Sequence, residues 1–274
     1  VDKWEDKGDI FGSAYEMGKF KGELISIGCA PNPQIYTYRK DLFKEAGLDP
    51  EKPPKTWAEL AEAAEKLTKR EGNKVVMAGL DLPATDTSLV FTEPFMRSAG
   101  SKVIDEVNLK PSFTDAGAIE ALTFIGDLAK KNIYIPHDFQ KSDEKPFVNK
   151  KGAIGNLSVS VIAKFKKDNP DLADKLGYLP ILSKDGSKPG TAFCGYQLYA
   201  MGASSKNKNE AWEFIKFLMS KEILWQRSQK MLYPPVRYSL EKQYIEADPV
   251  LNPIVLDHVK NGKGKATVPW ISIY

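Results

Sequence analysis

Apolar residues recur at helical spacing in several stretches of the chain. The clearest runs through Trp57, Leu60, Ala61, Ala64 and Leu67, at positions i, i+3, i+4, i+7 and i+10. Thr56 and Glu59 form a Thr-x-x-Glu capping box at its start, so a helix should begin there. The same pattern, with a Thr114-Asp115 cap before Ile119, Leu122, Ile125 and Leu128, predicts another helix. Further helices are expected at 89–99, 162–167 and 210–219.

Short apolar, β-branched or aromatic runs between these helices predict strands. They cover 22–28, 34–38, 75–79, 152–157, 178–181 and 195–201. Pro31 and Pro33 disfavour regular central pairing and suggest a crossover there. Strands that alternate with helices predict an α/β fold with mainly parallel sheets flanked by helices.

Length and charge narrow the class of protein. A chain of 274 residues suits one large domain or two modest ones. Its composition, 42% hydrophobic and 27% charged, is that of a globular protein. The net charge of +3 is too small to indicate nucleic acid or an anionic membrane as partner. No apolar run approaches the length of a membrane span.

Residues suited to metal binding or catalysis are few. Cys29 and Cys194 belong to no CxxC or Cys/His pattern, so no zinc site is indicated, and one long-range disulfide stays open. His137 and His258 are the only histidines. A glycoside hydrolase would use two carboxylates, and Asp81 with Glu93 or Asp105 would be candidates. With 36 acidic residues some such pair is inevitable, so this signal carries little weight.

Long ordered motifs resemble one family. Residues 36–48 read Tyr-Thr-Tyr-Arg-Lys-Asp-Leu-Phe-Lys-Glu-Ala-Gly-Leu, and residues 53–60 read Pro-Pro-Lys-Thr-Trp-Ala-Glu-Leu. They resemble the Y-x-K-D-L-F-x-x-A-G-L and P-P-x-T-W-x-E-L motifs of family 1 extracellular solute-binding proteins, the sugar-binding subunits of ABC importers. The segments 147–154, 193–196, 203–218 and 233–236 are similar to later motifs of that family.

The resemblance implies a two-lobed, type II periplasmic-binding-protein-like fold, with crossings near 31–34, 194–197 and 237–241. By comparison, 1–33 and 196–238 form an incomplete N-terminal lobe, and 34–195 and 239–274 form a C-terminal lobe without its terminal helices. The sequence is therefore expected to be a fragment that lacks both ends.

The same resemblance implies a function without catalysis. The protein would deliver a carbohydrate, a mono- or oligosaccharide, to the membrane permease of an ABC importer by hinge closure. No cofactor, metal or nucleic acid is expected. The chain is expected to be a monomer outside the cytoplasm, in the periplasm or lipid-anchored to the outer face of the membrane. A non-sugar solute, a glycan-interaction module and a glycoside hydrolase stay as alternatives.

Sugar binding needs aromatic faces for the ring and amides, carboxylates or hydroxyls for the sugar hydroxyls. Mapped onto the family, the expected ligand-binding residues are Asn32, Asp81, Asn156, Ser158, Tyr196, Trp270 and Tyr274. Each of the first five has a structural alternative: turn chemistry for Asn32, helix capping for Asp81, Asn156 and Ser158, and packing for Tyr196. Trp270 lies in a polar loop with no periodic reason to be buried.

Overall fold

The chain folds into two units in the computed structural model, which describes residues 4–83, 90–105, 108, 110–138, 141 and 143–264. Unit 1 comprises Val1–Pro33 and Cys194–Pro269, and unit 2 comprises Gln34–Phe193 and Trp270–Tyr274. Of the described residues, 239–264 thus group with unit 1, whereas the sequence placed 239–274 in the other lobe. The packing of this segment, described below, explains the difference.

One strand, β3 (Ile27–Arg39), runs through the boundary between the units without a break. The sequence predicted an interruption at Pro31 and Pro33. The strand continues because Gln34 donates its N–H to the Phe193 carbonyl (3.1 Å), on the side of β10 (Cys194–Tyr199). Alternate residues face opposite edges, so Pro31 and Pro33 point their missing N–H groups away from β10. Neither proline therefore removes a hydrogen bond from this pairing.

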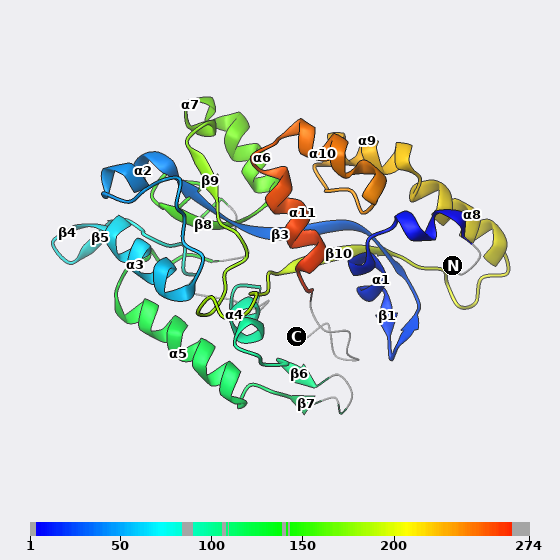
Figure 1. The fold of residues 1–274 in the computed structure, drawn as a ribbon, viewed down its shortest axis with the longest axis horizontal. Helices are drawn as coiled ribbons and strands as arrows, with labels where there is room; N and C mark the ends of the chain where they lie inside the picture. The colour runs from blue at the N-terminus through cyan, green and yellow to red at the C-terminus, as the bar shows by residue number, and fades with distance from the viewer. Residues whose placement is uncertain are drawn as a thin grey trace. The chain divides into compact units, whose positions relative to one another are not determined.

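Unit 1 places short helices and two hairpin strands around the first half of β3 (Figure 1). Its remaining elements are η1 (Glu5–Asp9), α1 (Gly12–Glu16), β1 (Lys19–Phe20), β2 (Glu23–Leu24), α8 (Lys208–Leu218), α9 (Lys221–Met231), η2 (Tyr238–Leu240), α10 (Glu241–Ala247) and α11 (Asn252–Asn261).

The segment after 238 belongs to unit 1 because its helices pack there. α10 and α11 contact each other, and α11 contacts α1. Asn252 donates its side-chain amide to the Tyr244 carbonyl (2.6 Å), which ties the two helices together. The Val259 carbonyl accepts a hydrogen bond from the Tyr196 hydroxyl (3.0 Å), which ties α11 to β10.

Unit 2 is built on the second half of β3, which pairs with β8 and β9 (Figure 1). Its elements are α2 (Lys40–Glu45), α3 (Trp57–Leu67), β4 (Lys69–Glu71), β5 (Lys74–Met77), α4 (Thr92–Ser98), β6 (Ile104–Asp105), β7 (Lys110–Pro111), α5 (Ala116–Lys130), β8 (Ile154–Ser158), α6 (Val159–Asp168), α7 (Pro170–Ala173) and β9 (Leu176–Tyr178).

The strand pairs do not run as expected. β3 pairs antiparallel with β10, β8 and β9, whereas the sequence predicted mainly parallel sheets. Within the described residues, parallel contact is limited to isolated bridges, Thr56 with Ser183 and Ala78 with Gly152. The reason is that one long strand organises both units, and the strands beside it return in the opposite direction.

The two helices with predicted caps, α3 and α5, both form, but the buried face of α5 differs from the predicted one. The capping box of α3 is formed by Thr56 and Glu59, as predicted. In α5, Asp115 caps the helix, but Ile119 and Leu122 are exposed. The close packing of α4 on α5 explains this, since a Cβ at Gly117 would lie 2.6 Å from the Ala99 carbonyl oxygen. The first half of the buried face therefore carries the small residues Gly117, Ala118 and Ala121, and Leu128 is buried nearer the end of the helix, as predicted.

Candidate functional site

Asp81 lies in the segment after β5 and is only 3% exposed. Its backbone N–H donates to the Ile154 carbonyl (2.8 Å), and its carboxylate accepts the Phe147 N–H at 3.2 and 3.3 Å. The backbone of Gly152 packs so closely that a Cβ there would lie 2.7 Å from Asp81 Oδ1. Asp81 is thus enclosed by the protein, and its contacts are those of a residue that positions the 147–155 segment.

The charge of Asp81 is opposed by a buried lysine. Burial raises the pKa of Asp81 from its ordinary value near 3.8 to about 7, although Lys145 and the Phe147 N–H both favour the carboxylate. Lys145 is itself only 5% exposed and donates to the Asn156 carbonyl (2.9 Å). The sequence analysis missed Lys145, because a lysine beside Pro146 carries no pattern that predicts burial.

Asn156 and Ser158 project from the same face of β8, opposite Tyr36 and Gln34 of β3. Asn156 is 4% exposed, and its Oδ1 is buried without a hydrogen-bond partner among the described residues. Ser158 is half-buried, and its hydroxyl lies 3.1 Å from that of Ser160. Ser158 occupies the N-cap position of α6 without a capping hydrogen bond. Its side chain therefore does not perform the alternative role that the sequence offered.

Asn32 and Tyr196 lie on neighbouring strands of unit 1, where Asn32 is opposite Gly195. The Asn32 side chain is exposed and has no hydrogen-bond partner in the described part of the chain. In contrast, the Tyr196 hydroxyl contacts Ser13 Oγ (2.9 Å) and donates to the Val259 carbonyl (3.0 Å). Asn32 is therefore available to a solute, whereas the Tyr196 hydroxyl is engaged in packing α1 and α11.

The structure places Asn32 and Tyr196 on paired strands of unit 1, with their side chains on opposite faces of the sheet. In unit 2, Asp81 lies beside β8, the strand that also carries Asn156 and Ser158, through its backbone bond to Ile154. Trp270 and Tyr274 lie outside the described residues.

The carboxylates considered for hydrolysis do not form an accessible pair. Asp81 and Glu93 are buried, at 3% and 1% exposure. Glu93 also lies 3.6 Å from Arg97. The Asp105 carboxylate accepts hydrogen bonds from the backbone N–H and the side-chain amide of Asn108, at 3.1 and 2.9 Å. This geometry gives no support to a hydrolase.

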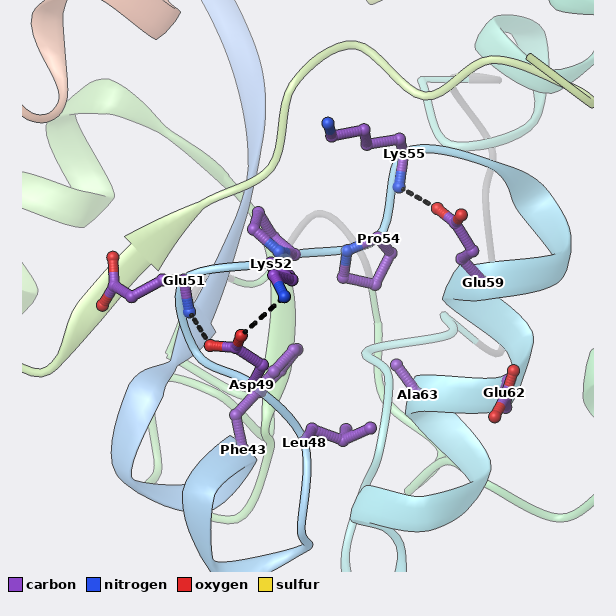
Figure 2. Close-up of a pocket in the computed structure, with 11 residues that line it drawn as sticks. Phe43, Leu48, Asp49, Glu51, Lys52, Pro54, Lys55, Glu59, Glu62 and Ala63 are labelled. Atoms are coloured by element: carbon purple, nitrogen blue, oxygen red, sulfur yellow. Dashed lines mark hydrogen bonds and ion pairs between the residues drawn. The ribbon is translucent and has the colours of Figure 1, made fainter.

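A separate surface pocket of about 410 Å³ lies in unit 2 between the loop 48–55 and α3 (Figure 2). Apolar and charged side chains both line it. Several of its carboxylates already have partners: Asp49 accepts from the Glu51 N–H and faces Lys52, and Glu59 accepts from the Lys55 N–H. Glu62 pairs with Lys66 at 2.7 Å. The pocket contains none of the predicted ligand-binding residues.

Neither metal-binding groups nor a membrane span is found in the described part of the chain. It contains no group of three or more His, Cys, Asp or Glu side chains able to hold a metal ion, and no helix long and apolar enough to cross a bilayer. Cys29 and Cys194 are buried free thiols, so they do not form the disulfide that the sequence left open. Burial lowers the pKa of both His137 and His258.

Curated relatives match most of this chain at low sequence identity. The chain is 26% identical over 238 residues to the sn-glycerol-3-phosphate-binding periplasmic protein UgpB of Yersinia pseudotuberculosis, covering 84% of this chain and 54% of that protein. It is 28% identical over 233 residues to UgpB of Escherichia coli K12, covering 82% and 51%. The chain thus spans about half the length of the curated relatives it matches.

Solved structures share the fold. The cyclic alpha-maltosyl-1,6-maltose binding protein of Arthrobacter globiformis matches with a TM-score of 0.79 at 20% identity, covering 97% of this chain and 68% of that one. The GacH receptor of Streptomyces glaucescens matches with a TM-score of 0.77 at 22% identity, covering 98% and 66%. Residues 2–223 also match the sequence profile of the bacterial extracellular solute-binding proteins. The two-lobed fold of these binding proteins is therefore that of this chain, which belongs to the bacterial extracellular solute-binding protein family.

Proposed function

We propose that this protein binds a carbohydrate outside the cytoplasm and delivers it to the membrane permease of an ABC importer. The observation that carries the proposal is the family match over residues 2–223. The GacH receptor, which shares the fold, was solved in complex with acarbose, and a relative of known structure at 25% identity, CpMnBP1, was solved with mannobiose bound.

The side chains suit a hydroxylated solute. Asn32 offers a donor and an acceptor at the protein surface, and the half-buried hydroxyl of Ser158 can reorient toward a ligand. We propose Asn32 and Ser158 as ligand contacts, and Trp270 and Tyr274 as stacking partners for a sugar ring. Asp81 and Asn156 would act through the 147–156 segment, and Tyr196 through the packing of α1 and α11.

We also propose how solute binding is coupled to a change in conformation. The described chain passes from one unit to the other at Pro33–Gln34 and at Phe193–Cys194, both next to the pairing of β3 with β10. A change of backbone angles at these two crossings would couple solute binding to hinge closure. A ligand shifts such an equilibrium only by its difference in affinity for the two states.

The remaining parts of the proposal concern the cell. The protein would act as a monomer in the periplasm or on the outer face of the membrane, where a lipid anchor would hold it. Its partners would be the solute and the permease, and no cofactor or catalysis is required.

A polyol phosphate is the second candidate solute. It is favoured by the two UgpB proteins, which are named for binding sn-glycerol 3-phosphate and are 26% and 28% identical to this chain. A phosphate ester keeps the hydroxyls of a carbohydrate but adds a double negative charge.

A thermal-shift screen of the full chain tests the proposal. Mono- and oligosaccharides, polyols and their phosphates are the probes, and we expect at least one to raise the melting temperature, because a ligand that binds only the folded state stabilises it. The Asn32→Ala variant should weaken that response. Asn207→Ala is the matched control, since Asn207 is another exposed asparagine of unit 1 whose side chain makes no hydrogen bond among the described residues. Silence across the whole panel would contradict the proposal.

A further inference from the structure

A cluster of polar side chains surrounds Arg227 in unit 1. Arg227 lies on α9, Gln197 and Tyr199 on β10, and Tyr233 just after α9. Arg227 Nη1 donates to the Tyr199 hydroxyl at 2.5 Å, and its Nη2 lies 3.5 Å from Gln197 Oε1. The guanidinium carbon is 5.7 Å from the centre of the Tyr199 ring. We call Arg227, Gln197, Tyr199, Tyr233 and the adjacent Cys29 the Arg227 cluster.

Among the described residues, every group that faces this guanidinium is neutral. Its oxygen partners are a phenol and an amide. The third neighbour is the Cys29 thiol, whose pKa is raised by burial even though Arg227 and Tyr199 lower it, so the thiol is protonated near neutral pH. Arg227 forms no ion pair with any carboxylate of the described residues. A half-buried positive charge is thus held without a negative counterpart.

The cluster also has more donors than acceptors. A guanidinium carries five N–H groups in a planar fork, and the second of the two oxygen contacts is at the long limit for a hydrogen bond. Gln197 turns its carbonyl to Arg227 and donates its amide N–H to the Tyr233 hydroxyl at 3.0 Å. Because Tyr233 accepts that bond, its own proton has no acceptor in the described part of the chain. The free donors of Arg227 and Tyr233 therefore belong to one cluster, linked through Gln197.

This arrangement has the chemistry of an oxyanion site. Arginine binds phosphate and carboxylate oxygens with two parallel N–H bonds, and such charge-assisted bonds are about twice as strong as neutral ones. A phenol proton adds a donor from a second direction, which favours a group with several oxygens. A neutral sugar hydroxyl would leave the charge without compensation.

We propose that the Arg227 cluster binds the oxyanion group of the solute, a phosphate ester or a carboxylate carried on a sugar or polyol. The inference rests on the proposed solute-binding function and narrows its substrate to an anionic carbohydrate derivative. Arg227 and Tyr233 contact the anion, Gln197 orients both, and Tyr199 fixes the plane of the guanidinium.

Isothermal titration calorimetry on the full chain, with ligands in matched pairs, tests this inference. The pairs are glycerol 3-phosphate with glycerol, glucose 6-phosphate with glucose, and gluconate with sorbitol, and inorganic phosphate is titrated alone. We expect at least one anionic probe to bind at least about tenfold more tightly than its neutral partner, and more weakly as salt is raised. The phosphate and gluconate arms distinguish a phosphate ester from a carboxylate.

Arg227→Gln should lower the affinity for the anionic probe by at least about tenfold and leave the affinity for any neutral probe unchanged. Lys230→Gln is the matched control, because Lys230 lies on the same helix, is exposed, and its side chain makes no hydrogen bond or ion pair with the described residues. It removes the same charge and should change affinity less than about twofold. Tyr233→Phe removes one donor and should lower the affinity for the anionic probe by a factor between those of the other two variants. An unchanged melting temperature would show that the fold is kept.

The outcomes separate this inference from the function on which it rests. If a neutral sugar binds as well as its anionic partner and Arg227→Gln has no effect, the oxyanion site is wrong and the solute-binding function stands. An anion that binds equally to Arg227→Gln and the wild type also overturns the site. If no probe binds, the result counts against both. If Arg227→Gln lowers the melting temperature, two single variants replace it. Arg227→Lys keeps the charge but lacks the planar pair of N–H donors, and Tyr233→Phe removes the phenol donor, so each should still weaken binding of the anionic probe.

Discussion

Two arginines of unit 1, ten positions apart in sequence, have opposite surroundings. Arg237 is 1% exposed in its side chain, and its three donor groups meet Met219 O (2.8 Å), Asp9 Oδ2 (2.9 Å) and Asp6 Oδ2 (2.7 Å). Arg227, in contrast, is half-buried and faces only neutral groups. The charge of Arg237 is therefore balanced by two carboxylates of its own chain, whereas no carboxylate of the described residues pairs with Arg227.

This difference indicates that the charge of Arg237 has a structural role, whereas the charge of Arg227 is available to a ligand. A buried charge is tolerated when acceptors of opposite charge satisfy it, and Arg237 holds the amino-terminal segment onto the turn after α8 in this way. Hydrogen bonds from Ser239 and Arg237 lower the pKa of Asp9 although its partial burial opposes this. Such a network leaves nothing for a ligand. The lack of that match at Arg227 supports a role in binding.

The largest expected effect is that of Arg237→Met. This substitution removes three hydrogen bonds and leaves Asp6 and Asp9 without their cation, so we expect the free energy of unfolding to fall by about 3 to 5 kcal/mol. Urea titration followed by circular dichroism measures it. Arg227→Gln, treated identically, should lose less than about 1 kcal/mol. Equal losses for the two arginines would remove the contrast between them.

Asp81→Asn tests the same principle in unit 2, where a buried carboxylate has incomplete compensation. Its folded pKa of about 7 exceeds the ordinary 3.8, so its contribution to stability is fully present below about pH 4 and is lost as pH rises through 7. We therefore expect Asp81→Asn to flatten the fall in unfolding free energy between pH 4 and 8. Near pH 8 the variant should gain about 2 to 4 kcal/mol, at about 1.4 kcal/mol per pKa unit.

Chemical denaturation across that pH range is the measurement, with Asp105→Asn as the control because Asp105 is half-buried rather than enclosed and accepts hydrogen bonds from Asn108 in a local turn. An unchanged pH dependence in Asp81→Asn would show that the carboxylate is already stabilised as an ion by Lys145.

The smallest expected changes in stability are those of Tyr196→Phe and Tyr233→Phe. Tyr196→Phe deletes hydrogen bonds to Ser13 and Val259 inside unit 1, which should cost about 1 to 2 kcal/mol. Tyr233→Phe loses only the bond from Gln197 and should cost less than about 0.5 kcal/mol. Thermal unfolding of both variants gives the difference. A Tyr233→Phe variant as unstable as Tyr196→Phe would indicate that the Arg227 cluster is structural.

The sequence predicted those parts of the fold that depend on neighbouring residues. The Thr56–Glu59 capping box and the Asp115 cap were correct because both are local. The buried face of α5 was predicted only in part: Leu128 is buried, but Ile119 and Leu122 are exposed because α4 packs closely against Gly117. The continuity of β3 through two prolines was also missed, because it depends on which edge of the strand is paired.

The candidate sites were predicted less well, for a related reason. Motifs led to Asp81, but its enclosure by Phe147, Gly152 and Lys145 is long-range. No motif distinguishes Arg227 from Arg237, because only the folded chain decides which arginine meets carboxylates. Family resemblance identified the family, whereas the partners of each charge required the structure.

The most direct test of this account is to observe the two guanidinium groups together by NMR. Their Nε–Hε resonances, assigned with Arg227→Gln and Arg237→Lys, are followed while inorganic phosphate and then glycerol 3-phosphate are added to the full chain. We predict a saturable shift of the Arg227 resonance and none of Arg237. An Arg227 resonance that stays still, or one that moves together with Arg237, would contradict the assignment of Arg227 as the anion-binding residue of this solute-binding protein.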